Sequence, residues 1–367
     1  GGPRGPVATT IEAIARGAGP VVALDVPSGV NADTGEVLGA AITAQMTVTF
    51  HGDKPGLHIE PGRRHAGQVV IGDIGVPATA TSTPVAWLAG TGSGQVPAKP
   101  AVTDKYGAGS VLVIAGSPGL TGAGILCARA TLRAGAGLTV GAVPQTVQPI
   151  FAAGAAEVMF APIPDDAGTL TYASLDAVVA QAGRVGAVVI GPGLGREAAT
   201  TAFVRAVLEA VELPTVVDAD GLWHLGRRPS WLARRGGPTL LTPHAGEAAR
   251  LLGVPRDQVE AARLGSSRRL ADICGSVVVL KGPGTITTDG EGVVVIDAIG
   301  TVALASAGSG DVLSGIIAAM SAKGLAPLAA AATGVAVHAR AGVLATRGDG
   351  TIAGDIIEQL PAAIGAA

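Results

Sequence analysis

Short runs of β-branched and other apolar residues recur along this chain, and each is followed by a glycine-rich or polar turn. From Lys105 onward these runs alternate with segments of helical character, which predicts alternating strands and helices. The pattern favours a central, mostly parallel sheet that is flanked by helices on both faces. The predicted strands are Val111–Ala115, Leu138–Ala142, Ala187–Ile190, Thr215–Val217, Thr239–Thr242 and Val277–Leu280, and a hairpin of Ile286–Thr288 and Gly292–Asp297 turns at Asp289 and Gly290.

A smaller α/β unit is predicted before this alternation, over residues 1–77. It contains a short helix at Ile11–Arg16 and strands at Val21–Asp25, Met46–Phe50 and Gln68–Ile71. Residues 78–104 are rich in Thr, Pro, Ser, Gly and Ala, which is typical of a linker. We therefore expect three parts, namely residues 1–77, a linker at 78–104 and a large domain at 105–367. The longer helices expected in the large domain are Leu120–Ala134, Val312–Met320, Leu328–Leu344 and Ile352–Ile364.

The composition argues against two classes of partner. Hydrophobic residues make up 48% of the chain, but no uninterrupted apolar run approaches the roughly 18 residues of a membrane span. The nearest candidate, Leu325–Val337, is short and is interrupted by Pro327, so we expect a core helix there. A formal net charge of −3 provides no basic surface for nucleic acid. Neither a membrane nor a nucleic acid is expected as a partner.

The cysteines and the chain start indicate a cytoplasmic protein. Cys127 and Cys274 are isolated from each other and from any Cys/His cluster, which is typical of buried thiols in a reducing compartment. The chain starts at Gly1 without a charged and then apolar leader, so export is not indicated. The missing initiator methionine suggests an N-terminal truncation.

Five predicted strands end in glycine or polar clusters, and such ends share one edge of a parallel sheet, where ligands bind. The sequence lacks the GxxxxGK[ST] pattern, which disfavours a P-loop enzyme. The five clusters are Gly116–Gly119, Gly191–Gly195, Asp218–Gly221, Pro243–Glu247 and Lys281–Thr285.

Three of these clusters are ambiguous when taken singly. The Lys281–Thr285 turn offers N–H groups, a cation and a hydroxyl for phosphate or ribose, but it could equally be a β-turn with a solvated lysine. His244 stands at a helix start, where capping is the ordinary role and metal binding is disfavoured. Asp218 and Asp220 could ligate Mg²⁺, although capping of the following helix is the favoured interpretation.

A further glycine turn, Gly308-Ser309-Gly310, runs directly into a helix. Unpaired N–H groups at such a helix start attract anions, phosphate above all. Asp311 is unusual there because its charge would repel a phosphate. It should therefore either cap the helix or act on a second substrate.

The first unit resembles the C-terminal half of an NAD(P)H-hydrate epimerase domain. The matching segments are LDVPSGVNADTG (24–35), TVTFHGDKPGL (47–57) and GQVVIGDIGVP (67–77). The resemblance implies that Asp25 contacts the hydrated nicotinamide nucleotide and that Ser28 helps to hold K⁺. The family's upstream nucleotide-binding loop is not in this chain, so we expect epimerase activity to be lost or incomplete.

Residues 105–364 resemble the ADP-dependent NAD(P)H-hydrate dehydratases of the ribokinase-like superfamily. The matching segments include IGPGLGRE (190–197), VVDADGLWHL (216–225), LTPHAGEAARLLG (241–253), VLKGPGT (279–285) and ASAGSGDVLSG (305–315). Ser309 replaces the threonine of the family's GTGD motif and keeps a small hydroxyl.

This second resemblance implies that the S epimer of NAD(P)H-hydrate is dehydrated to NAD(P)H while ADP is cleaved to AMP and phosphate, with Mg²⁺ required. It assigns Asp311 as the catalytic base, with Ala123, Gly193 and His244 also contacting the hydrate. The implied nucleotide-binding residues are Lys281, Gly282, Pro283, Gly284, Thr285, Gly308, Ser309 and Gly310.

The expected partners are the hydrate and ADP, and the expected assembly is a homo-oligomer, for which a tetramer is one candidate. Two other functions remain open at this point. One is a ribokinase-like kinase of a small alcohol, and the other is a nucleotide-binding regulator that lacks catalysis.

Overall fold

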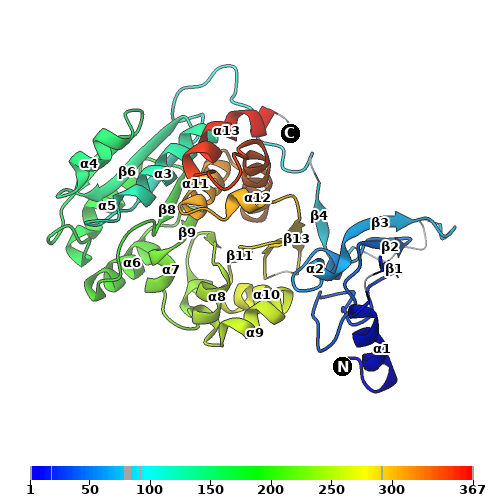
Figure 1. Ribbon diagram of the computed structural model, residues 1–367. Coiled ribbons are helices and arrows are strands. Elements are labelled where there is room, and N and C mark those ends of the chain that lie inside the picture. The colour runs from blue at the N-terminus through cyan, green and yellow to red at the C-terminus, as the bar shows by residue number, and fades with distance from the viewer. Residues whose placement is uncertain (1, 18, 78–83, 91, 291, 366–367) are drawn as a thin grey trace.

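The computed structural model describes residues 2–17, 19–77, 84–90, 92–290 and 292–365, and it contains a small N-terminal α/β unit beside a large one (Figure 1). The small unit has a parallel sheet in the order β1-β2-β3, which confirms the three predicted strands. Its first helix begins at Pro6, earlier than expected, with proline in the first turn where its missing N–H costs no helix bond. The elements are α1 (Pro6–Ala15), β1 (Val22–Leu24), β2 (Met46–Phe50), η1 (Pro55–Leu57), α2 (Arg63–Ala66) and β3 (Gln68–Gly72).

The large unit is built on a ten-stranded sheet in the order β4-β13-β12-β11-β10-β9-β8-β5-β6-β7. Its pairs are parallel except β11 with β12 and β12 with β13, and the second of these antiparallel pairs is the predicted hairpin. The strands are β4 (Trp87–Ala89), β5 (Ser110–Ile114), β6 (Leu138–Pro144), β7 (Met159–Ile163), β8 (Ala187–Ile190), β9 (Thr215–Val217), β10 (Thr239–Leu241), β11 (Val277–Leu280), β12 (Thr285–Thr288) and β13 (Val294–Asp297).

Helices cover both faces of this sheet (Figure 1). Alternate residues of one strand belong to different cores: Leu112 packs with one set of helices, and Val111 with the other. The strands are therefore apolar at every position, as a doubly covered parallel sheet requires. One set comprises α5 (Leu175–Ala182), α6 (Ala198–Ala210), α7 (Asp220–His224), α8 (Ala245–Leu252), α9 (Arg256–Ala261) and α10 (Arg263–Cys274); the other comprises α3 (Thr121–Arg133), α11 (Ser309–Ala322), α12 (Pro327–Leu344) and α13 (Ala353–Gly365).

Shorter helices complete the large unit. They are α4 (Gln148–Gly154), η3 (Tyr172–Ser174), η4 (Ser230–Arg234) and η5 (Val302–Leu304).

Strand β4 lies within the segment that the sequence led us to expect as a linker. It pairs in parallel with β13 at the edge of the large sheet. Its Trp87 and Leu88 are 58% and 44% exposed, so this three-residue edge strand has no buried apolar run to reveal it. Residues 78–83 and 91 of the expected linker lie outside the described residues.

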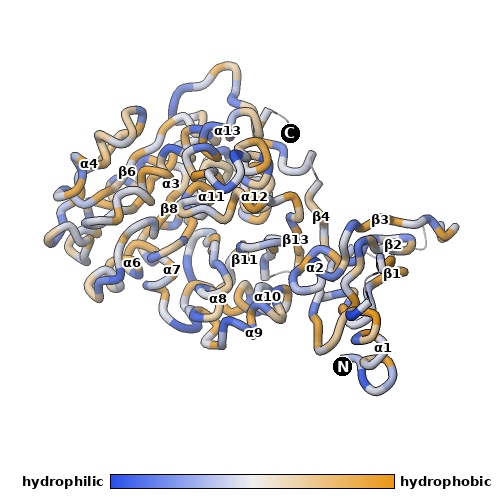
Figure 2. Tube along the Cα trace, in the orientation of Figure 1, coloured by the Kyte–Doolittle hydropathy of each residue, from blue (hydrophilic) through white to orange (hydrophobic). Residues whose placement is uncertain are grey.

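Helix α12 is long and apolar enough to span a membrane by length and composition, but 67% of it is buried in the protein. It packs on α11 and α13 within the core, in the hydrophobic middle of the molecule (Figure 2). The expectation of a core helix at this position is therefore confirmed.

Candidate active site

Helix α11 begins where its backbone can approach another group closely. The residue before it, Gly308, has φ +86°, and a Cβ there would lie 2.5 Å from Cδ1 of Leu126 in helix α3. Only glycine fits both conditions. The N–H of Ser309 donates to Ser306 O at 3.2 Å, whereas that of Gly310 has no acceptor within the described chain. The N–H of Gly308 also has no acceptor among the described residues, and of these two free donors Gly310 lies beside the cavity described below.

Asp311 lies in the first turn of α11 and is largely withdrawn from solvent. Within the described residues its carboxylate forms no hydrogen bond or ion pair. Burial, followed by the nearby negative charge of Asp218, raises its pKa to about 7, although the Lys281 ammonium opposes this shift. A buried acid with such a pKa can accept a proton near neutral pH.

Beside it lies a buried ion pair between the ends of two strands. Lys281 Nζ, after β11, is 2.8 Å from Oδ1 of Asp218, which follows β9 and is 1% exposed. Burial favours the neutral acid, but Lys281 outweighs this effect and keeps the pKa of Asp218 below its usual value. Ser314 of α11 donates to the other oxygen, Oδ2. A Cβ on Gly310 would lie 3.3 Å from Lys281 Nζ, so the ion pair adjoins the start of α11.

His244 is the N-cap of α8, as its ordinary role predicted. Its Nδ1 accepts from the N–H groups of Gly246 at 3.0 Å and Glu247 at 3.2 Å. Desolvation and then the Lys281 charge lower the pKa of His244. The accepting Nδ1 places the ring proton on Nε2, which lies 3.6 Å from Oε1 of Glu247.

The capping role favoured for Asp218 and Asp220 is wrong. Helix α7, which follows them, has no side-chain cap. Asp218 is held by Lys281, and Asp220 accepts from the Gly195 N–H at 3.1 Å and from Arg196 Nε at 3.0 Å. Both carboxylates instead bind residues on the loops that follow other strands. The local sequence spacing does not reveal these partners.

Ala123 and Gly193 lie on neighbouring elements. Gly193 has φ +63°, and a Cβ there would lie 2.1 Å from Leu120 O, just before α3, the helix that carries Ala123. Ser117 Oγ also donates to Gly193 O at 2.9 Å. The two glycine loops after β5 and β8 therefore pack on each other, as their predicted positions at one sheet edge require.

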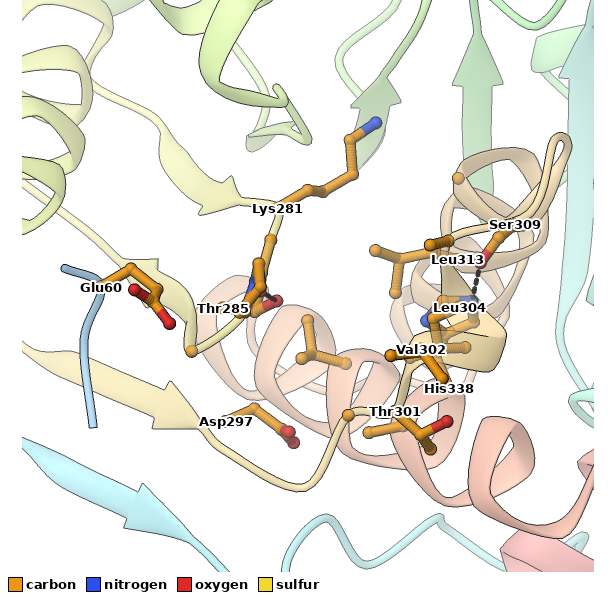
Figure 3. A pocket seen from close by; sticks show the side chains of 18 of the residues that line it. Glu60, Lys281, Thr285, Asp297, Thr301, Val302, Leu304, Ser309, Leu313 and His338 are labelled. Carbon is orange, nitrogen blue, oxygen red and sulfur yellow. Dashed lines mark hydrogen bonds between the residues drawn. The ribbon is translucent and has the colours of Figure 1, made fainter. Parts of the chain in front are cut away.

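A cavity of about 520 Å³ opens beside this cluster (Figure 3). Seven of the eight residues expected to bind nucleotide line it, namely Lys281, Gly282, Pro283, Gly284, Thr285, Ser309 and Gly310. Gly308, Ala123, Gly193, His244 and Asp311 are not among the lining residues. The expected nucleotide residues thus surround one hollow, and Lys281 and Gly310 lie where it meets the Asp311 cluster.

His338 of α12 is a site residue that sequence reasoning missed. It is buried, and its Nε2 is 3.1 Å from the Ser309 hydroxyl (Figure 3). Burial lowers its pKa to about 4, so the ring is neutral. The only signal in the sequence was a single histidine inside an apolar helical segment. The neighbouring sequence does not connect this histidine with Ser309.

Asp25 is at the carboxyl end of β1, as predicted, and has a cationic partner. Lys54 Nζ is 2.6 Å from Oδ1 of Asp25, and this hydrogen bond is the main reason that the pKa of Asp25 lies below its usual value. Lys54 lies in the loop that follows β2. Ser28 is exposed, and its backbone oxygen accepts from Ile42 N.

Comparisons with known proteins identify both units. The sequence profile of the NAD(P)H-hydrate dehydratase family matches residues 111–362, and that of the YjeF-related protein N-terminus matches residues 1–56. The chain is 41% identical over 352 residues to the bifunctional NAD(P)H-hydrate repair enzyme Nnr of Moorella thermoacetica, covering 93% of this chain and 66% of that protein. The corresponding enzyme of Mycobacterium tuberculosis is 39% identical over 325 residues, covering 88% and 63%.

The fold also matches solved structures. The ADP/ATP-dependent NAD(P)H-hydrate dehydratase of Bacillus subtilis, co-crystallised with ATP and Mg²⁺, superposes with a TM-score of 0.63 at 27% identity, covering 73% of this chain and 93% of that one. A ribokinase-like protein of Enterococcus faecalis shares the fold at 22% identity and a TM-score of 0.65, covering 78% and 97%. The chain spans slightly less than two thirds of the M. thermoacetica and M. tuberculosis enzymes. Since the family profile covers more than half of it, the chain belongs to the NAD(P)H-hydrate dehydratase family.

Proposed function

We propose that this chain dehydrates the S epimer of NAD(P)H-hydrate to NAD(P)H and converts ADP to AMP and phosphate. The observation that carries the proposal is the placement of Asp311. It is a largely buried carboxylate, unpaired among the described residues, with a pKa raised to about 7, in the first turn of α11 beside the Gly310 N–H. Family membership and the names of the relatives support the same reaction.

In the proposed reaction, Asp311 takes the proton of the ring hydroxyl while the hydroxyl oxygen attacks the terminal phosphorus of ADP. The bond between that phosphorus and the bridging oxygen breaks, and AMP leaves. The ring nitrogen then supplies the electron pair that expels phosphate, and loss of a neighbouring ring proton forms the double bond. Hydroxide is a poor leaving group, so this phosphorylation makes the dehydration feasible.

The helix start and the ion pair have separate roles in this scheme. The Gly310 N–H and the positive end of α11 stabilise negative charge on the transferred phosphoryl group. Lys281 supplies a cation for the nucleotide phosphates while it neutralises Asp218. Asp311 can therefore face the ring hydroxyl of the hydrate, while the Gly310 N–H and Lys281 face the phosphates of ADP.

Ala123, Gly193 and His244 are proposed to contact the hydrate, as the family resemblance implies. The packing of Gly193 on the start of α3 and the exposed side chain of His244 support these assignments. Lys281–Thr285 and Gly308–Gly310 are proposed to hold the nucleotide.

The residues present fit a Mg²⁺ ion that is held mainly by phosphate oxygens and water. Within the described ranges no cluster of three or more His, Cys, Asp or Glu side chains could form a protein-only metal site. Mg²⁺ in nucleotide sites keeps several waters and takes most of its other ligands from the phosphates, so Asp311 can remain free to act as the base. Such an ion would neutralise phosphate charge.

For the N-terminal unit we propose that Asp25 contacts the nicotinamide nucleotide and Ser28 contributes to a K⁺ site. The location of both residues just beyond a parallel strand supports this assignment. Omission of K⁺ should leave dehydration unchanged, because Ser28 does not line the proposed nucleotide cavity. We also propose a cytoplasmic homo-oligomer, which cell fractionation and light scattering would test.

The decisive experiment incubates the chain with hydrated NADH, Mg²⁺ and ADP and follows the return of NADH absorbance. AMP in place of ADP is the control, because it has no terminal phosphoryl group to transfer. Equal release of AMP and NADH supports the proposal. Transfer of phosphate to a stable small alcohol without NADH recovery would instead identify a kinase.

A further inference from the structure

The cavity beside Lys281 is formed by both units of the chain. Most of its lining comes from the Lys281–Thr285 turn, the Gly300–Ala305 segment and the helices α11 and α12. Glu60 and Arg63 of the N-terminal unit complete the lining. Figure 1 shows α2, which starts at Arg63, beside strands β4 and β13 of the large sheet. The proposed nucleotide site therefore has a wall outside the dehydratase family match at residues 111–362.

This wall touches two parts of the cavity that belong to the large unit. Arg63 Nη2 donates to Ala298 O at 3.0 Å, and Ala298 leads into the Gly300–Ala305 segment. On the other side, a Cβ on Gly284 would lie 2.2 Å from His58 O, so the Lys281–Thr285 turn rests directly on the N-terminal unit. Segment 58–63 thereby bridges two cavity walls that are separate in the sequence.

The two ends of the cavity differ in charge. Lys281 and the start of α11 form an end that suits phosphates. Glu60 and Asp297 lie across the cavity from Ser309 and His338 (Figure 3). Asp297 is 5% exposed, and its Oδ2 has no partner among the described residues. Carboxylates repel phosphates but accept hydrogen bonds from hydroxyl groups, so this end suits the nucleoside part of a ligand.

Glu60 is held so that one oxygen remains available. Arg64 Nε donates to its Oε2 at 2.7 Å, which fixes the carboxylate, while Oε1 accepts no hydrogen bond from the described residues. The Glu60 side chain is 18% exposed, so a hydrogen bond there is partly shielded from water.

We propose that segment 58–63 completes the nucleotide site, with Glu60 accepting a hydrogen bond from a ribose hydroxyl of ADP and Arg63 positioning the Ala298–Ala305 wall. This inference rests on the proposed function, because it takes ADP as the occupant of the cavity. Glu60 is a contact residue, whereas Arg63 acts through the backbone of Ala298. The N-terminal unit thus serves the dehydratase site directly.

The test measures calorimetric binding of ADP, 2′-deoxy-ADP and 3′-deoxy-ADP to the full chain with Mg²⁺. E60A should weaken ADP binding roughly tenfold, as expected for one hydrogen bond to a charged group. It should also abolish the preference of the wild type for ADP over one deoxy analogue. R63A should weaken all three ligands alike, roughly fivefold, and R63K should recover much of the loss.

Glu12→Ala and Arg16→Ala are the matched controls. Both residues are exposed on or beside α1, and their substitutions remove the same charges as E60A and R63A. Both should bind ADP like the wild type. In turnover assays E60A and R63A should raise the KM for ADP and leave kcat near its normal value, which general damage to the fold would not do. Thermal unfolding of each variant checks that the fold is intact.

Two results would overturn the inference while the proposed function stands. One is wild-type ADP affinity in both E60A and R63A, and the other is an unchanged deoxy preference in E60A. A wild-type chain that binds none of the three nucleotides would remove the proposed function together with the inference.

Discussion

Each unit has an aspartate beside a lysine, but the pKa values of the two aspartates are shifted in opposite directions. Asp25 has a side chain 47% exposed and is 2.6 Å from Lys54, and that hydrogen bond lowers its pKa. Asp311 is largely buried and unpaired among the described residues, and its pKa is raised to about 7. The first is a fixed anion at neutral pH, and the second can gain or lose a proton.

The difference in pKa arises first from the burial of Asp311, and second because the lysine of the large unit is paired with another acid. Lys281 forms its close ion pair with Asp218, and the Asp218 charge then opposes ionisation of Asp311. In the small unit Lys54 donates directly to Asp25 and Phe50 O. Thus a nearby lysine does not by itself set the pKa of a carboxylate; the burial of that carboxylate and the primary partner of the lysine do. Only Asp311 is suited to act as a base.

The largest effect is expected from Asp311→Asn. If Asp311 takes the hydroxyl proton, the amide should lower kcat by about 10²–10⁴-fold. ADP should still bind, because the Gly310 N–H and Lys281 remain. Single-turnover formation of NADH measures the loss, and ADP titration checks binding. Near-normal turnover with intact binding would show that Asp311 is not the base.

Lys281→Met should cause the largest loss of stability. It leaves Asp218, which is 1% exposed, without its ion-pair partner, and an uncompensated buried charge costs about 3–5 kcal/mol. Urea unfolding at neutral pH measures the change. The double variant Lys281→Met with Asp218→Asn should recover part of it, because the buried charge is then gone.

The central strands were predictable because each is buried on both faces. Ala187–Ile190, Thr215–Val217 and Val277–Leu280 have the bounds expected from their continuous apolar runs. Their strand-end clusters could be assigned to one sheet edge for the same reason. Strand β7 was not predicted: it contains Pro162, which is tolerated because β7 is the edge strand of the sheet.

The partners of the site residues could not be predicted from local pattern. Lys281 and Asp218 are 63 positions apart, and Arg63 and Ala298 are 235 apart. Such pairs depend on how the units pack, which composition and periodicity do not encode. The sequence therefore indicated which loops meet at the sheet edge. The raised pKa of Asp311 could not be predicted, because it depends on which residues surround the carboxylate.

Asp311→Asn should also stabilise the fold above neutral pH. The pKa of Asp311 rises from an ordinary 3.8 to about 7 on folding, so the native state binds more protons than the unfolded state between these values. The free energy of unfolding therefore falls as pH rises through this interval. The variant lacks this loss and should gain about 2–4 kcal/mol at pH ~8 but little at pH ~4. Urea unfolding at both pH values gives the comparison, and an equal change at both would contradict the assigned pKa.

Lys54→Met provides the smallest effect and the counterpart to Lys281→Met. Asp25 is half exposed, so water can solvate it once its partner is removed, and the loss should be about 0–1 kcal/mol in urea unfolding. Because Lys54 lowers the pKa of Asp25, its stabilisation is present above the ordinary pKa near 3.8 and disappears as pH falls through the lowered value. Dehydration should continue at the wild-type rate, since neither Lys54 nor Asp25 lines the nucleotide cavity. A destabilisation as large as that of Lys281→Met would mean that the small unit depends on its ion pair as strongly as the buried site does.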